Sequence, residues 1–450
     1  MNYLPATDQD IKEMLEKIGV SSTEELFKHV PSEVRLKRPL NIHAGLSEYE
    51  VLRKMTTLSK KNKTTSELVS FLGAGAYQHY QPLLVGQLIS RSEFFTAYTP
   101  YQAEISQGTL QAIYEYQTCV CEIFGMDVAN ASVYDGSVAL AEAINMATDK
   151  KHEVILTTAL NPEYTKVVET YCHGYGVKVN IAKHKNGLSP VEVYEPLMSK
   201  NVGAIVVQYP NFFGNIDDIK ALADFAHANG ALLIVATSDV AAMGLLEAPG
   251  KLGADIVAAE GMSFVGPLQL SGPSLGMMAT TNKLVRKLPG RIIGKTIDSS
   301  GNPAFVLTLQ AREQHIRREK ASSNICSNQG LNALAACITM VTLGKQGLQV
   351  MAERSAQKAH YCYQQLLTIP GIEPVFDAPF FDEFLIKLPK DVSYVNKCLL
   401  DEGILGGCCL DRFLGYYPEL DNVALYCVTE LRTKSEIDNL VNKLGVILRG

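Results

Sequence analysis

The sequence has few cysteines and no metal-ligand spacing, and this excludes two classes of small stabilised domain. Ten cysteines in 450 residues are too sparse for a disulfide scaffold, so a reduced compartment fits best. Cys119 with Cys121 and Cys408 with Cys409 lack the two-residue gap of a zinc knuckle and a second matching pair. We therefore predict no metal site and interpret Cys119 and Cys121 as core residues.

An excess of basic charge, a secretory signal and a membrane span are also missing. The chain has 41 basic and 47 acidic residues, a net charge of −6, with no long run of one sign that would attract nucleic acid or an anionic membrane. The longest strongly apolar stretch, Leu331 to Leu343, falls short of the roughly 20 residues that a spanning helix requires. No basic segment followed by an apolar run opens the chain. We expect a cytoplasmic protein that binds neither nucleic acid nor membrane.

Helix start and stop signals dominate the first 65 residues. Ser22 to Glu25 and Ser47 to Glu50 both have the spacing of a capping box, in which a hydroxyl and a carboxylate each bond a free backbone N–H. Gly19 is placed to end the first helix. The sequence predicts an N-terminal helical segment over 1–65.

Short β-branched runs alternate with helical windows such as Ile216 to Asn229 in the middle of the chain. This alternation predicts a large α/β domain over 66–330, with a mixed, mostly parallel sheet covered by helices on both faces. Ligands of such a sheet bind beyond the carboxyl ends of the strands. The predicted strands are Val154–Thr158, Val177–Ala182, Ala204–Gln208, Ala231–Ala236 and Ile256–Ala259.

The last third of the chain has a different order, with a long helix followed by strand, helix, strand and helix. A capping box at Thr433 to Glu436 marks the start of the final helix. We expect residues 331–450 to form a smaller α+β domain.

Local motifs of several enzyme classes are absent from the sequence, and pyridoxal phosphate chemistry is the remaining candidate. The sequence has no phosphate loop, no nucleophile elbow and no H-E-x-x-H zinc motif. Pyridoxal enzymes need an imine lysine, an acid at the ring nitrogen and a phosphate cup at a helix start. Tyr134-Asp135-Gly136-Ser137 precedes a helix that runs to Ala147. These residues fit such a cup, but an ordinary capped helix start is the default interpretation.

Four segments carry a resemblance to a known family over nearly the full length. The chain resembles the first subunit of the split glycine-cleavage P-protein, glycine dehydrogenase (decarboxylating). This implies the fold-type-I pyridoxal-phosphate architecture, with glycine as substrate and aminomethyl transfer to the lipoyl group of H-protein. The segments are Phe71–Tyr77, Glu93–Gly108, Gly125–Ser132 and Arg312–Arg318 with Ser323–Cys326.

The resemblance also implies that this chain has lost the cofactor lysine. In the family's companion subunit that lysine precedes a Gly-rich turn, and the matching stretch here, Gly261 to Pro267, has Met262 at its place. A thioether cannot form an imine. Ala236 stands where the acid of the ring nitrogen is expected, with Asp239 three residues later. We expect pyridoxal phosphate on the companion subunit 2, and no catalytic residue on this chain alone.

A chain without its own cofactor can complete the site of its companion across a subunit interface. Pro100 keeps a stretch of hydroxyls, aromatic rings and one carboxylate out of a helix. These side chains suit either a shared cofactor and substrate site or plain subunit packing, and Glu104 also fits a helix cap. The candidates are Thr96, Tyr98, Thr99, Tyr101 and Glu104.

A predicted helix over Arg312 to Lys320 offers cations for the same interface. Its mixed charges are typical of a solvated face, while Arg317, with Ser323 and Asn324 after the helix, would suit a phosphate or carboxylate of the shared site. His79 is interpreted as structural.

Two other functions stay open at this point. The chain could be a non-catalytic scaffold that stabilises its companion and docks H-protein. It could also be an independent pyridoxal enzyme that uses Lys283 or Lys295.

Overall fold

The computed structural model describes residues 5–148, 150–270, 272–321, 323–325 and 329–449. The chain forms two compact units, Met1–Lys63 and Thr64–Gly450. In the part of the chain that is described, no helix combines the length and apolar character needed to cross a membrane.

The first unit contains α1 (Asp8–Ile18), the 3-10 helix η1 (Thr23–Phe27) and α2 (Glu48–Ser59). Gly19 ends α1 in the left-handed conformation, with φ of 83°, as predicted. Ser47 and Glu50 form the predicted capping box of α2.

The capping box predicted at Ser22 is wrong. Ser22 precedes only the short helix η1 and makes no side-chain cap bond. The Glu25 carboxylate instead accepts hydrogen bonds from the backbone N–H and hydroxyl of Ser21. A neighbouring hydroxyl therefore competes successfully for the carboxylate on which the box depends.

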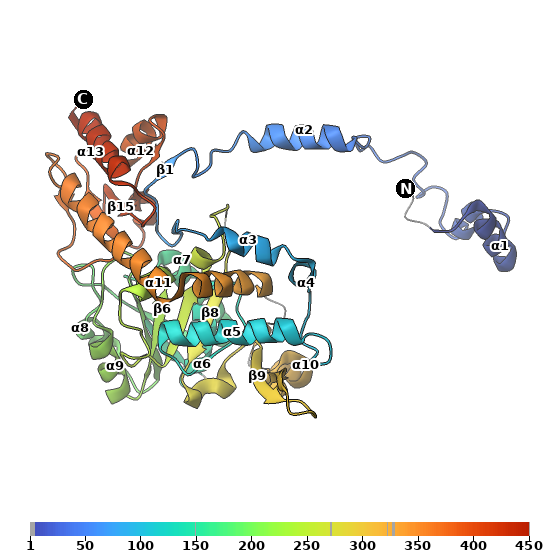
Figure 1. Cartoon of the computed structure of the whole chain (residues 1–450), viewed down its shortest axis with the longest axis horizontal. Helices are drawn as coiled ribbons and strands as arrows, with labels where there is room; N and C mark the ends of the chain where they lie inside the picture. Colours follow the sequence, from blue (N-terminus) through green and yellow to red (C-terminus); the bar gives the residue numbers. More distant parts are fainter. Residues whose placement is uncertain (1–4, 149, 271, 322, 326–328, 450) are drawn as a thin grey trace. The chain divides into compact units, whose positions relative to one another are not determined.

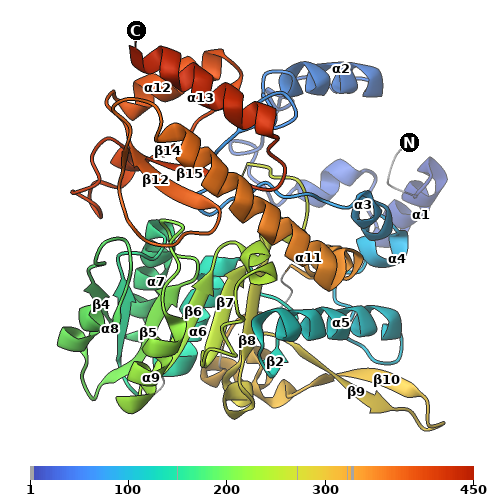
Figure 2. The same cartoon turned by 60° about the vertical axis from the view of Figure 1, so that its left-hand side comes forward.

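A seven-stranded sheet in the order β2-β8-β7-β6-β5-β3-β4 forms the centre of the second unit (Figure 2). Strands β3 to β7 are parallel, and β8 and β2 extend the sheet in antiparallel pairs. The prediction of a mixed, mostly parallel sheet and of five strands within it is confirmed. The strands are β2 (Val128–Ala129), β3 (Glu153–Thr157), β4 (Lys178–Ala182), β5 (Val202–Gln208), β6 (Leu232–Thr237), β7 (Ile256–Glu260) and β8 (Gly276–Thr280).

Helices cover both faces of this sheet because successive strand residues point to opposite sides. In β6, Leu233 and Val235 pack in one core with α5 (Gln107–Phe124) and α9 (Ile219–Ala228). Ile234 and Ala236 pack in another with α6 (Gly136–Thr148) and α7 (Pro162–Tyr175). The buried-strand pattern read from the sequence thus corresponds to two apolar faces.

A four-stranded antiparallel sheet in the order β11-β12-β15-β14 forms the smaller lobe. The predicted capping box at Thr433 is confirmed, since its hydroxyl accepts from Glu436 N at 3.2 Å and its own N–H donates to the Glu436 carboxylate at 2.6 Å. The elements are β11 (Glu373–Pro374), β12 (Glu383–Lys387), α12 (Val392–Asp401), β13 (Ile404–Leu405), β14 (Cys408–Cys409), β15 (Val423–Cys427) and α13 (Lys434–Arg449).

The long helix α11 (Gly330–Leu366) joins the two lobes (Figure 1). It is interrupted at Gly344, whose φ of 60° and ψ of −176° are not helical. Ala336 before the interruption belongs to the core of the large sheet, while Cys362 after it belongs to the core of the small lobe. Strand β1 (Val69–Ser70) also pairs with β13 of the small lobe.

The helix predicted over Arg312 to Lys320 is wrong as a continuous element. Tertiary partners break it, because Arg312 donates to the Gly290 carbonyl at 2.6 Å and Glu313 pairs with Arg291 at 3.1 Å. Arg318 has a positive φ of 54°. The pieces are η6 (Gln310–Arg312), α10 (Gln314–Arg317) and η7 (Arg318–Lys320).

The remaining elements are short. Strands β9 and β10 form a hairpin that extends away from the large sheet (Figure 2). These elements are α3 (Leu83–Ile89), α4 (Ser92–Phe95), α8 (Val191–Tyr194), η2 (Glu195–Leu197), η3 (Val240–Gly244), η4 (Met262–Phe264), η5 (Asn282–Lys287), β9 (Ile292–Ile297), β10 (Pro303–Thr308) and η8 (Leu410–Phe413).

Candidate functional site

Buried polar groups collect where the carboxyl ends of the parallel strands meet the small lobe. Gln208 ends β5, Ser238 and Asp239 follow β6, and Glu260 ends β7; all four are buried. Parallel sheets bind their ligands at this edge. The candidate site is therefore this edge, where the sequence predicts it.

The segment after β1 closes the site from the small-lobe side. Ala74 N and the Tyr77 hydroxyl donate to the two carboxylate oxygens of Glu383 at 2.6 and 2.7 Å. A Cβ on Gly73 would stand 2.2 Å from Glu383 Oε1 and 2.6 Å from Cys427 Cβ. Only glycine lets the chain pass this close to β12.

His79 connects the two lobes through buried ion pairs. Its Nε2 lies 3.0 Å from Oδ2 of Asp239, which follows β6, and its Nδ1 lies 2.7 Å from Oε2 of Glu430, which follows β15. Burial acts to lower the pKa of His79, but the two carboxylates outweigh it and raise the pKa well above the usual value. His79 is thus a cation at neutral pH, and its structural interpretation is supported.

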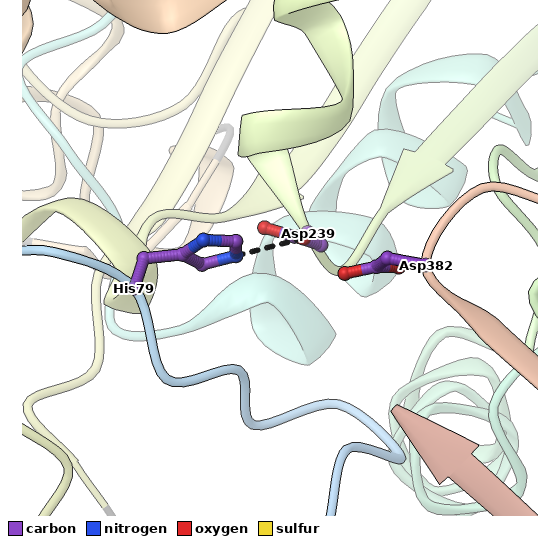
Figure 3. A group of neighbouring side chains, drawn as sticks. All are labelled: His79, Asp239 and Asp382. Carbon is purple, nitrogen blue, oxygen red and sulfur yellow. Dashed lines mark hydrogen bonds and ion pairs between the residues drawn. The ribbon is translucent and has the colours of Figure 1, made fainter. Parts of the chain in front are cut away.

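A second acid, Asp382, lies beside this pair (Figure 3). Burial and the neighbouring carboxylates of Asp239 and Glu383 raise the pKa of Asp382 well above its usual value. His79, Asp239 and Asp382 each offer one ligand atom within 4.8 Å of the others. Both nitrogens of His79 are already bonded to carboxylates, so we interpret the group as an ion-pair cluster.

The start of α6, which the sequence predicts as either a phosphate cup or an ordinary helix start, is a capped helix start. Oδ1 of Asp135 accepts from Val138 N at 2.8 Å and from the Ser137 hydroxyl at 2.5 Å. Gly136 N donates to Oε2 of Glu260 at 2.9 Å. The N–H groups of Gly136 and Val138, two of the first in the helix, are therefore bonded to carboxylates of the chain itself.

Pyridoxal phosphate does not fit the residues present at this edge. Met262, directly after β7 and Gly261, has no amine for an imine. Ala236 is a fully buried core residue of β6 and offers no acid to a ring nitrogen. The carboxylates of Asp135 and Glu260 accept hydrogen bonds from Gly136 N, Val138 N and the Ser137 hydroxyl, which a phosphate bound here would need as donors.

The Tyr-rich stretch borders two cavities. Tyr98 and Tyr101 line a mainly apolar cavity of about 280 Å³ between α5 and the start of α11. Thr99 and Tyr101 line another of about 370 Å³ together with Arg291 and His315.

Thr96 and Glu104 are exposed and line neither cavity. Thr96 ends α4, with its hydroxyl donating to the Ser92 carbonyl at 2.6 Å. Glu104 is exposed. Helix α5 begins after Ser106 without a side-chain cap, so the interpretation of Glu104 as a cap is wrong.

Arg291 brings the two predicted interface segments together. Its guanidinium lies 4.2 Å from the ring centroid of Tyr101 and pairs with Glu313.

The three other predicted interface residues do not share a partner. Arg317 is exposed and donates to the Ala311 carbonyl at 3.0 Å, Ser323 donates to Glu142 at 3.3 Å, and Asn324 is exposed.

Sequence reasoning missed most of the buried acids. Glu260 had a usable signal, because an acid directly after a buried parallel strand lies at the ligand-binding edge. The small lobe contributes the buried Asp382 and Glu383 and also Glu430, whose side chain is 10% exposed. Their approach to His79 depends on how the lobes pack, which no local pattern shows.

Comparisons with solved structures define the class of the fold. A sphingosine-1-phosphate lyase of Burkholderia pseudomallei matches with a TM-score of 0.66 at 14% identity, over 93% of this chain and 94% of that one. A C-DES variant with glycine covalently linked to its PLP cofactor matches at 0.62 and 13%, over 85% and 97%. The chain has the fold of the fold-type-I pyridoxal-phosphate enzymes.

Closer relatives identify the family. Residues 1–444 match the family model of the glycine cleavage system P-protein. The crystal structure of an inhibitor-bound glycine decarboxylase (P-protein) of the glycine cleavage system matches with a TM-score of 0.90 at 40% identity, over 100% of both chains. The probable glycine dehydrogenase (decarboxylating) subunit 1 of Brevibacillus brevis is 54% identical over 99% of both chains, and that of Desulfitobacterium hafniense is 50% identical over 99% and 100%. The chain belongs to the P-protein family.

The buried cation of the lobe junction is tested by substitution. His79→Ala leaves Asp239 and Glu430 buried without their shared cation, and should lower the free energy of unfolding by about 3–5 kcal/mol. The control is His227→Ala. His227 is half-exposed and pairs with Asp255, and this more exposed ion pair should contribute less than about 1 kcal/mol. Urea unfolding at pH 7 measures both. Equal losses in the two variants would show that the His79 pairs do not hold the lobes together.

The pH dependence of stability tests the burial of Glu260. Burial raises its pKa from 4.5 to about 7, so between these values the folded chain binds more protons than the unfolded chain. The free energy of unfolding should therefore fall as pH rises through this window, by up to about 3 kcal/mol from this group. Glu260→Gln should lack this fall. Parallel pH profiles for the two proteins would contradict the assignment.

Proposed function

We propose that the chain is the subunit without a cofactor in a two-subunit glycine dehydrogenase (decarboxylating). The observation that carries this proposal is that the strand edge does not fit the cofactor. Met262 takes the expected lysine position in a chain that matches the P-protein family over residues 1–444. Pyridoxal phosphate is then held by the companion subunit. Glycine is the substrate, and the lipoyl group of H-protein receives the aminomethyl group.

The names of the relatives support a two-chain enzyme. Several curated relatives, 49–54% identical in sequence to this chain, are called subunit 1 and have nearly the same length as this chain. A subunit numbered in this way has a companion. The activity belongs to the pair, and this chain contributes surface and side chains to it.

An exposed apolar surface near the Tyr-rich stretch supports a contact with the companion. Tyr98 is 82% exposed and Ile105 84% exposed, and Leu83 and Phe95 of the nearby short helices are also exposed. Exposed apolar groups gathered on neighbouring elements are typical of interaction surfaces. Aromatic side chains are enriched in the buried centres of interfaces.

The predicted site residues receive roles at this contact. Tyr98 and Tyr101 would present rings and hydroxyls to the companion's site, Thr96 and Thr99 would add hydroxyls, and Glu104 would add a carboxylate. Arg317, with Ser323 and Asn324, would contact an anionic group. Their shared task is to exclude water and to shape the entry for the lipoyl arm.

The scaffold alternative keeps the same contact surface but gives these residues no part in the reaction.

The alternative of an independent pyridoxal enzyme has less support. Lys283 follows β8, whose last residue Thr280 pairs with Ile256 at the start of β7, so it lies at the edge opposite the candidate site. Lys295 is exposed on the β9–β10 hairpin.

The division into 1–65, 66–330 and 331–450 remains part of the proposal. The first segment would serve association, because α1 and α2 have no buried residue in their own unit and carry apolar side chains such as Leu52 and Met55. Helices of this kind are stable when their apolar faces are covered by a partner.

Reconstitution with the companion subunit tests the function and the role of the tyrosines. Glycine-dependent exchange of labelled bicarbonate should need both chains. The double variant Tyr98→Ala, Tyr101→Ala should lower the exchange rate by about tenfold or more, which corresponds to roughly 1.4 kcal/mol of lost transition-state stabilisation.

The control is Tyr394→Ala, a half-exposed tyrosine of α12 that should leave the rate unchanged. Assembly of each variant with the companion is checked by size-exclusion chromatography. An unchanged rate in the assembled double variant would favour the scaffold alternative. Full exchange by the companion alone would contradict the proposed function.

A further inference from the structure

The carboxylate of Glu260 lies in a cradle of backbone N–H groups. Oε1 accepts from Met262 N at 3.0 Å and from Leu275 N at 2.8 Å, and Oε2 accepts from Gly136 N at 2.9 Å. The donors come from three segments, namely the turn after β7, the approach to β8 and the start of α6. Helix starts and convergent backbone N–H groups are the usual binding site of anions in proteins.

The bonding pattern requires an acceptor at every point of the cradle. All three hydrogen bonds to Glu260 come from N–H donors, and each would lose its partner if the carboxylate were removed. Buried N–H groups without an acceptor are costly. Burial raises the pKa of Glu260 to about 7, so the group is an anion in mildly alkaline solution.

The cradle has no room for a second anion beside Glu260. Glu260 is 4% exposed. A Cβ added to Gly136 would lie 2.4 Å from the Tyr164 hydroxyl and 2.9 Å from Glu260 N and Cβ. The chain itself therefore fills this place closely.

We propose that Glu260 is an internal substitute for a phosphate, whose carboxylate closes the anion cradle at the start of α6. The cradle is kept by the fold, and the chain supplies its own anion instead of a cofactor's. Met262, which stands at the expected lysine position, lies two residues after Glu260. The residue that removes the imine and the residue that closes the cradle therefore belong to the same turn. This inference concerns anion binding alone and stands whether or not the chain acts on glycine.

Chemical rescue tests the proposal on the full-length chain. Glu260→Ala removes a group with the size and charge of acetate and opens the three donors to added anions. At pH 8 and matched ionic strength, sodium acetate and sodium phosphate should each raise the melting temperature of this variant by about 2 °C or more above its value in sodium chloride, with saturation. The wild-type chain should show no such difference.

Asp217→Ala is the matched control. Asp217 is also buried and accepts a backbone N–H from Ser189 at 2.5 Å, but its other oxygen is bonded to the Asn211 side chain at 2.9 Å. Its removal leaves no cluster of backbone donors, so no anion-specific shift is expected. A folded Glu260→Ala chain without rescue, or an equal shift in the wild type, would overturn the proposal.

If Glu260→Ala does not fold in chloride, the added anions decide. Acetate or phosphate at pH 8 should then restore a cooperative melting transition to this variant, while chloride at the same ionic strength should not. The absence of a folded state in all three salts would overturn the proposal.

Discussion

The pairing of one buried cation with carboxylates from both lobes is the interaction on which the arrangement of the site depends. Asp239 belongs to the end of the large sheet and Glu430 to the small lobe, and His79 bonds both. Each carboxylate alone would be costly to bury. The ion pairs therefore fix the lobes at the strand edge and hold the segment between β1 and α3 across it.

The edge that would bind a ligand in related folds is consequently filled by the chain's own polar groups. Glu383 accepts a hydrogen bond from Tyr77 in the segment after β1, and Glu260 accepts one from Gly136 at the start of α6. Such internal bonds keep the geometry of a binding site without the need for a ligand. They also explain how a chain can keep the fold of a cofactor-dependent family when its own side chains fill the strand edge.

The five parallel strands β3 to β7 and the caps at Gly19, Ser47 and Thr433 were predictable, because their signals are local in sequence; the antiparallel strands β2 and β8 were not predicted. The Ser22 cap and the Arg312–Lys320 helix were not, since Ser21, Gly290 and Arg291 redirect their polar groups. The buried acids of the small lobe depend on contacts between residues far apart in the chain. The roles of Tyr98 and the other interface candidates stay predictions, because they concern a partner surface that the sequence of one chain does not contain.

The location of pyridoxal phosphate tests the central claim most directly. The reconstituted pair would be treated with the cofactor and borohydride, digested and analysed by mass spectrometry for pyridoxyl-lysine. The account predicts the label on a lysine of the companion subunit and on no lysine of this chain. A pyridoxyl group on Lys283, Lys295 or any other lysine of this chain would contradict it.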